Sequence, residues 1–335
     1  MKTSIAPAGV LLGVLIFACP ACDHKVPVSA GRPARAEPAS GGPDQEPKPS
    51  VASKGRIFVA VTTAPGSALE GEEKDPYRGT TILAVDPDTG ASERIVEKAA
   101  EPRLSADGKT MVYVTAKGIA VGMGNGPSRF IKDVDPEKTW PLLSADGKEI
   151  IYDIESPQAK DGRRSFDSWR CGAADGGRTK LPIPDADRVI DWSPDGQWLL
   201  TLRWGRRGGA VQLHIMRPDG TGEWRLSDGS GVISIARFSP DGKRLVYMHQ
   251  EGIKNALWVM DLDGQHRTKI VDYSSAWHPW ACWSPDGKRL AVIDNEFTPE
   301  GHGTGFHLDV MDADGRNRRT LPLPKALRMS APDWR

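Results

Sequence analysis

The chain has 335 residues, and its 44 lysines and arginines balance 44 aspartates and glutamates, so no overall field draws it to nucleic acid or an anionic membrane. Hydrophobic residues make up 39% of the sequence, which is enough for a core and excludes a wholly disordered chain. The 36 glycines and 27 prolines recur throughout and interrupt helices, so the composition excludes a helical bundle and favours short strands joined by tight turns.

Residues 1–22 are expected to form an export signal. Lys2 precedes an uncharged stretch whose densest apolar run, Val10–Ala18, is too short to span a bilayer and suits the hydrophobic region of a secretory signal. The run Leu15-Ile16-Phe17-Ala18-Cys19 resembles a bacterial lipobox, so we expect lipidation at Cys19. Cys22 is a second candidate with a poorer match, and an ordinary cleaved signal is the alternative.

Residues 23–52 are expected to form a disordered, Pro-rich tether between the membrane and the folded domain. This segment contains six prolines and few large apolar side chains. It cannot bury enough surface to offset the entropy of ordering it. An acyl chain inserts by burying methylene groups, so the neutral overall charge does not oppose anchoring.

From residue 53 onward a turn motif recurs, Ser-(Pro/Ala)-Asp-Gly, with an apolar residue before it and a β-rich apolar run after it. Its five copies begin at Ser105, Ser144, Ser193, Ser239 and Ser284. Pro presets φ, Asp can bond nearby backbone and Gly supplies a positive φ, so the motif is typical of a hairpin turn. A second turn, centred on Asp-Gly, falls midway through most units. Each unit is therefore predicted to be an antiparallel meander of four strands, a to d.

Units of four strands and about 45 residues have the size of a propeller blade. The termini supply a sixth unit: Ile57–Val61 follows a Ser-Lys-Gly turn as a strand b would, and Ala331–Trp334 mimics a strand a with no blade after it. The prediction is an all-β, six-bladed β-propeller over residues 53–335, closed by pairing of its N- and C-terminal segments. The second unit is the least regular.

The repeated Ser-Pro-Asp-Gly turns resemble the propeller of the TolB-type periplasmic family with WD-like repeats. The resemblance covers nearly all of the chain after residue 52 and is specific for fold. TolB itself carries an α/β domain before its propeller, and residues 23–52 are too short and too polar for one. The resemblance therefore implies a periplasmic propeller relative without that domain.

The b–c and d–a loops, on one side of the disc, are longer and more varied than the a–b and c–d turns on the other. Variable loops on a rigid scaffold commonly carry function. We therefore expect partner contacts at that face and at the channel mouth, through the Trp, Arg and His side chains Trp204, Arg206, Arg207, Trp277, His278 and Trp280. Packing of Trp277 and Trp280 between blades, and an ordinary loop role for His278, are the alternatives.

Charged residues recur two positions before the turn serine, on strand a. Their alignment predicts inter-blade ion pairs between Arg103 and Asp333 and between Asp191 and Arg237, as structural features. Cys171 and Cys282 fall in different blades and are expected to be free buried thiols. No catalytic constellation, cofactor motif or metal-ligand spacing is present in the sequence.

These observations favour an exported, membrane-anchored and non-catalytic propeller that binds a protein or cell-envelope partner as a monomer, in the periplasm and on the outer membrane. The alternative is a propeller-based enzyme, such as a metal-dependent polysaccharide lyase, with its site at the channel mouth. That alternative would need His249, His278, His302 and His307 to cluster.

Overall fold

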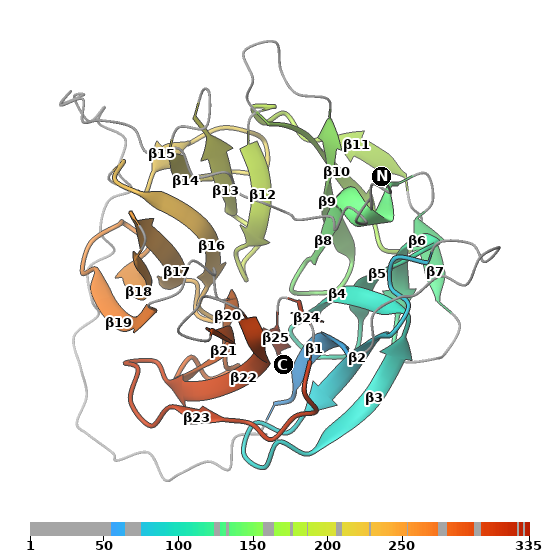
Figure 1. The fold of residues 1–335 in the computed structure, drawn as a ribbon. Helices are drawn as coiled ribbons and strands as arrows, with labels where there is room; N and C mark the ends of the chain where they lie inside the picture. Colours follow the sequence, from blue (N-terminus) through green and yellow to red (C-terminus); the bar gives the residue numbers. More distant parts are fainter. Residues whose placement is uncertain are drawn as a thin grey trace, which may run out of the picture.

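The computed structural model describes residues 55–63, 75–123, 128–131, 134–156, 164–174, 177–185, 187–205, 210–227, 229–252, 254–273, 280–297, 303–326, 328–330 and 332–335. Within them, six antiparallel sheets form a closed ring around a central channel (Figure 1). This confirms the six-bladed, all-β propeller, and the irregular second unit forms a complete four-stranded blade. The predicted signal and tether, including Cys19, lie outside the described residues.

The strands follow the a-b-c-d order in every blade. Blade two contains β4 (Ala99–Leu104), β5 (Met111–Thr115), β6 (Gly118–Gly122) and β7 (Arg129–Ile131). After a short 3₁₀ helix, η1 (Pro136–Lys138), blade three contains β8 (Thr139–Leu143), β9 (Glu149–Ser156), β10 (Ser165–Gly172) and β11 (Arg178–Lys180). Blade four contains β12 (Asp187–Trp192), β13 (Leu199–Trp204), β14 (Val211–Met216) and β15 (Trp224–Arg225).

The remaining blades repeat the pattern. Blade five contains β16 (Val232–Phe238), β17 (Arg244–Glu251), β18 (Lys254–Asp261) and β19 (Thr268–Tyr273). Blade six contains β20 (Trp280–Trp283), β21 (Arg289–Phe297), β22 (Gly303–Asp312) and β23 (Arg319–Thr320). Blade one contains β1 (Ile57–Thr62), β2 (Thr80–Val85) and β3 (Ser92–Glu97), and takes its strand a from β24 (Arg328–Met329) and β25 (Asp333–Trp334).

The ring is closed by the two ends of the described chain. In blade one Ile57 is in register with Trp334, and Val61 with Met329, so the C-terminal strands pair directly with β1 (Figure 1). The Trp334 indole also donates a hydrogen bond of 3.2 Å to the Gly55 carbonyl. This confirms the predicted closure, which leaves no unpaired inner edge on blade one.

The turn serine closes each a–b hairpin, a role that the sequence analysis did not assign to it. In blade five the Ser239 hydroxyl donates to Asp241 Oδ1 at 2.5 Å and accepts from the Arg244 amide at 2.9 Å. The Gly242 amide donates back to the Ser239 carbonyl, with φ at +68° as the motif predicts. The same bonds recur in the other four copies, which explains why each needs Ser, Asp and Gly together.

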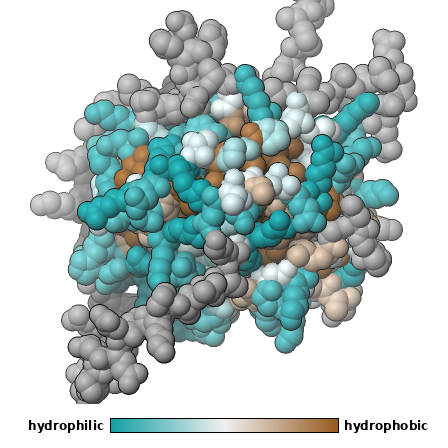
Figure 2. Space-filling view, turned by 90° about the horizontal axis from the view of Figure 1, so that it is seen from below, coloured by the Kyte–Doolittle hydropathy of each residue, from teal (hydrophilic) through white to brown (hydrophobic). Residues whose placement is uncertain are grey.

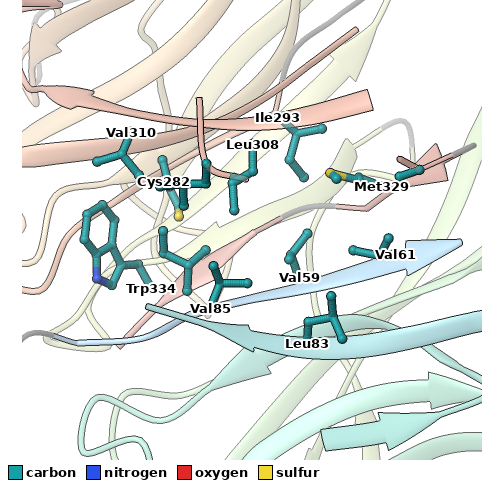
Figure 3. Close-up of a cluster of buried hydrophobic side chains, with 14 residues drawn as sticks. Val59, Val61, Leu83, Val85, Cys282, Ile293, Leu308, Val310, Met329 and Trp334 are labelled. Carbon is teal, nitrogen blue, oxygen red and sulfur yellow. The ribbon is translucent and has the colours of Figure 1, made fainter. Parts of the chain in front are cut away.

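The core is divided among the blade junctions. Each of the six hydrophobic clusters joins two neighbouring blades. Along β5, Met111 and Tyr113 face the junction with blade one, and Val112 faces the junction with blade three. Strands buried on both faces must be apolar at successive positions, which explains the continuous apolar runs after each turn. Figure 3 shows the junction where Trp334 packs beside residues of blades six and one.

Several b–c loops are shorter than expected, because strands b and c continue pairing beyond their apolar runs. In blade six the sequence predicts a loop over Asn295–Gly305, but β21 continues to Phe297 and β22 begins at Gly303. In blade five, β17 and β18 pair as far as Glu251 and Lys254. The rim of the disc, seen edge-on in Figure 2, is mostly hydrophilic, with hydrophobic residues visible between polar ones.

Candidate functional site in the central channel

A small cavity lies in the central channel, between the innermost strands of blades two to six. Its walls come from strand a of each of these blades: Glu101, Arg103, Trp140, Pro141, Leu142, Arg188, Val189, Ile190, Ser234, Ile235, Arg237 and Trp280. Most of these residues occupy the first half of their strands. Strand a runs from the d–a loop to the a–b turn, so the cavity lies toward the predicted binding face.

Three arginines from three different blades line this cavity. Arg103 comes from β4, Arg188 from β12 and Arg237 from β16. The Arg188 guanidinium lies 3.8 Å from the centre of the Trp140 ring of blade three, a close cation–π contact. Burial lowers the pKa of Arg188 to about 10 and that of Arg237 to about 10, which still leaves both side chains charged at neutral pH.

Asp191 and Asp333 occupy equivalent positions in strand a, and the carboxylate of each accepts a hydrogen bond from a backbone amide of the next blade. Asp191 of blade four accepts a 2.7 Å hydrogen bond from the Phe238 amide, and its Oδ1 lies 3.9 Å from Arg237 Nη1. Arg237 also donates to the Ile190 carbonyl. The structure therefore contains the Asp191–Arg237 ion pair, at the long end of the range for such contacts.

The arrangement around Asp333 differs from the expected Arg103 pair. Its carboxylate accepts a 2.6 Å hydrogen bond from the Leu104 amide, and within the described residues its ion pair is with Arg335 at 3.4 Å. Arg103 donates instead to the Pro102 carbonyl at 3.0 Å. Asp333 thus binds the backbone of the residue that follows Arg103.

Three residues that line the cavity carry donor atoms without partners. The Nε atoms of Arg103 and Arg188 and the Ser234 hydroxyl are buried, and none has a hydrogen-bond partner among the described residues. Buried polar groups are nearly always paired, so three such atoms around one cavity are unusual. The sequence patterns did not indicate Trp140, Arg188 or Ser234 as channel residues. The signal that could have indicated these residues is a polar or aromatic side chain near the start of each of these a strands.

The predicted contact residues fall into three groups. Trp280 is half-buried and lines the cavity. Trp204 lies away from it, with its ring 5.1 Å from that of Phe166 and 5.7 Å from the Arg164 guanidinium at the junction of blades three and four. Arg206, Arg207, Trp277 and His278 lie outside the described residues, so their roles stay predictions.

One group of metal-ligand types lies in blade six, outside the cavity. Ligand atoms of Asp294, His307 and Asp309 lie within 4.8 Å of one another. Arg318 Nη2 lies 2.9 Å from Asp294 and 2.5 Å from Asp309. The single guanidinium therefore pairs with both carboxylates and offsets one of their two negative charges.

The described histidines do not support the four-histidine cluster. His249, in blade five, contacts the Ser230 carbonyl at 3.0 Å, and His307 belongs to the blade-six group. His278 and His302 lie outside the described residues. Both described cysteines, Cys171 and Cys282, are buried, and neither forms a disulfide bond, as predicted. The described residues also contain no helix with the length and hydrophobicity needed to cross a bilayer.

No protein-family model matches the sequence. An uncharacterized protein of Agrobacterium fabrum is 27% identical over 197 residues, which are 56% of this chain and 62% of that protein. The Tol-Pal system protein TolB of Gluconobacter oxydans is 32% identical over 101 residues, 28% of this chain and 21% of that protein. The chain thus spans less than two thirds of the length of either relative.

Solved structures give a broader match. The crystal structure of TolB from Acinetobacter baumannii matches with a TM-score of 0.63 and 20% identity, over 84% of this chain and 66% of that one. At this identity the likeness concerns the fold. Together with the ring of six blades closed by its C-terminal strands, it shows that the chain has the TolB-type β-propeller fold.

Proposed function

We propose that this chain is an exported, lipid-anchored propeller that acts as a non-catalytic binding scaffold for a protein or cell-envelope partner. The contact face is the side of the b–c and d–a loops, with the channel cavity at its centre. The observation that carries the proposal is the cavity wall, where half-buried Trp140, Arg188 and Trp280 meet. Trp and Arg are the side chains that most often dominate binding energy at interfaces.

The envelope location is proposed from the sequence signals and from the fold. The lipobox-like run ending at Cys19 and the Pro-rich residues 23–52 suit a domain tethered to a membrane. The TolB relative is named for an envelope system, and a periplasmic or outer-membrane site for this chain is consistent with that likeness. A scaffold role agrees with a cavity lined by arginines and aromatic residues.

The binding face is tested by crosslinking and pull-down from envelope fractions. A Trp280→Ala/Arg206→Ala variant is compared with wild type and with Trp169→Ala/Arg316→Ala. The control removes the same residue types from outer strand β10 and from the c–d turn of blade six. A partner recovered by wild type and the control, and lost by the first variant, supports the proposal. Equal recovery by all three proteins would refute this contact face.

Anchoring is tested separately by metabolic labelling with a fatty acid. We expect label in wild type and in Cys22→Ser, and loss of both the label and membrane association in Cys19→Ser. Label retained in Cys19→Ser and lost in Cys22→Ser would move the anchor to the second cysteine. Absence of label from all three proteins would leave an ordinary secretory signal.

A further inference from the structure

We propose that Arg188 forms a pH-dependent switch in the channel wall: its guanidinium stacks on the Trp140 ring while Asp153 is protonated, and pairs with the Asp153 carboxylate once that group ionises. The inference goes beyond the proposed function, because it concerns the channel wall itself and needs no partner. Three observations support it: the placement of these side chains, the atoms that lack hydrogen-bond partners, and the charges around them.

Trp140, Asp153 and Ser168 lie side by side on one face of blade three. Trp140 of β8 is in register with Asp153 of β9, which in turn is in register with Ser168 of β10. Paired residues on adjacent strands project from the same face, with Cβ atoms about 5 Å apart. Arg188, from β12 of blade four, places its guanidinium carbon 3.8 Å from the centre of the Trp140 ring. A rotation of the Arg188 side chain is therefore enough to carry the guanidinium from the ring to the neighbouring carboxylate.

Arg188 and Asp153 each have a buried atom that lacks a partner. Among the described residues, neither the Arg188 Nε donor nor the Asp153 Oδ2 acceptor makes a hydrogen bond. The other carboxyl oxygen, Oδ1, accepts the Ser168 hydroxyl at 2.5 Å. Within the same described ranges Arg188 forms no ion pair, and its charge rests on the Trp140 ring. The two unpartnered atoms are the halves of one charge-assisted hydrogen bond between neighbouring blades.

Protonation of Asp153 decides which contact Arg188 makes. Asp153 is fully buried, and burial raises its pKa to about 7, although the Ser168 hydroxyl, Arg188 and the Val189 amide favour the ionised form. Below that pH the neutral carboxyl does not attract the guanidinium away from Trp140. Above it, a buried carboxylate without a cation costs more than the loss of one cation–π contact. The guanidinium therefore moves to Asp153 and uncovers the Trp140 ring at the cavity wall.

The other charged groups around Arg188 leave one competing partner. Besides Asp153, the groups that act on its charge are Glu101, Glu155 and Arg164. Glu155 is already paired with Arg164 at 2.9 Å. Asp187, the neighbour of Arg188 in β12, is held by Arg203 at 2.5 Å. Among the described residues this leaves Glu101 of β4 as the alternative, which the experiment separates from Asp153.

The test follows the purified chain, labelled with fluorotryptophan, by fluorine NMR from about pH 5 to about pH 9. The Trp140 resonance is identified by its loss in Trp140→Phe. We expect it to shift with a midpoint at about pH 7 in wild type, and to keep its low-pH position in Asp153→Asn. Trp169 is the internal control, because it carries an Arg178 stack at 4.9 Å on the opposite face of blade three. Its resonance should stay in place and reports that each variant is folded.

Arg188 is followed through its Nε–H resonance, which is identified by its loss in Arg188→Lys. We expect this resonance to move with the same midpoint as Trp140 in wild type, and not in Asp153→Asn. Glu101→Gln should leave both titrations unchanged, and their loss in that variant would refute Asp153 as the switching group. A Trp140 resonance that does not change with pH, a titration that persists in Asp153→Asn, or movement of Trp140 without Arg188 would each overturn the proposal. Equal movement of Trp169 would do the same, since it would show a change of the whole blade.

Discussion

The carboxylate of Asp333 accepts a 2.6 Å hydrogen bond from the Leu104 amide of the next blade. Three blades further around the ring, Asp191 makes the same bond to the Phe238 amide at 2.7 Å. In a ring of six, these two junctions lie on opposite sides of the channel (Figure 1). One acidic side chain thus links strand a of one blade to strand a of the next, at two opposed places.

We expect Asp333→Ala to lower the free energy of unfolding by about 2–3 kcal/mol, because it leaves the buried Leu104 amide unpaired. Asp333→Asn should cost less, since its amide oxygen can still accept that bond. Chemical denaturation measures both values. Asp314→Ala, which removes an exposed carboxylate of the blade-six c–d turn, should change stability by less than about 0.5 kcal/mol. Equal costs for Asp333→Ala and Asp333→Asn would contradict the role of the hydrogen bond.

Removal of a turn serine should open its hairpin. Ser239 is fully buried, and its hydroxyl is the acceptor for the Arg244 amide. Ser239→Ala is expected to cost about 1–3 kcal/mol, the range for leaving a buried donor unsatisfied. Thr221→Ala is the control, because the Thr221 hydroxyl bonds Asp219 in an exposed turn. If both variants have the same melting temperature, the Ser239 hydroxyl does not stabilise the hairpin.

The sequence predicted the architecture well because its main signals are local. The five Ser-x-Asp-Gly turns mark where each strand a ends and strand b begins, through bonds spanning five residues, as between Ser239 and Arg244. The sixth blade could be predicted for a similar reason, since Trp334 repeats the aromatic position of Trp283. An arginine guanidinium lies over each of these indole rings: Arg289 over Trp334 and Arg244 over Trp283.

The site was less predictable because it depends on contacts between blades. Arg188 and Trp140 are 48 positions apart in the sequence and come together only because blades three and four are neighbours in the ring. Likewise, the partner of Asp333 is a backbone amide, which leaves no trace in side-chain identity. The loop residues chosen from the sequence include Trp204, whose side chain packs on Phe166 away from the cavity.

Trp334 should be sensitive to truncation because it takes part in ring closure. Its side chain is fully buried in the junction cluster of blades six and one (Figure 3). Trp334→Ala should cost about 3–5 kcal/mol, the usual range for such a truncation in a core. Trp169→Ala, on outer strand β10, should cost clearly less because Trp169 is only partly buried. A similar loss in both variants would mean that closure adds nothing to stability.

The two described thiols should resist alkylation in the native state. Cys171 and Cys282 are buried, and burial raises the pKa of Cys282 to about 12, so the reactive thiolate is scarce. Peptide mapping by mass spectrometry after a brief iodoacetamide pulse should find both thiols unmodified, and both modified in denaturant. Rapid labelling of Cys282 in the folded chain would place it at an accessible surface.

Asp153 should make stability fall as the pH rises. It is fully buried in β9, with a 2.5 Å hydrogen bond from the Ser168 hydroxyl, and burial raises its pKa to about 7. Between about pH 4 and pH 7 the folded chain holds this proton while the unfolded chain releases it. The stabilisation that Asp153 contributes is therefore complete at a pH below the pKa of Asp153 in the unfolded chain. It is lost as the pH rises through the pKa of Asp153 in the folded chain.

Asp153→Asn mimics the protonated side chain at every pH. We therefore expect the variant to gain stability relative to wild type from about pH 4.5 to about pH 8, by a few kcal/mol at most. Asp167→Asn is the control: a hydrogen bond from Lys180 lowers the pKa of Asp167, so its contribution should stay constant over that range. Denaturation at several pH values measures both differences. If the difference in the free energy of unfolding between Asp153→Asn and wild type does not change with pH, Asp153 keeps the same protonation state in the folded and unfolded chains across this range.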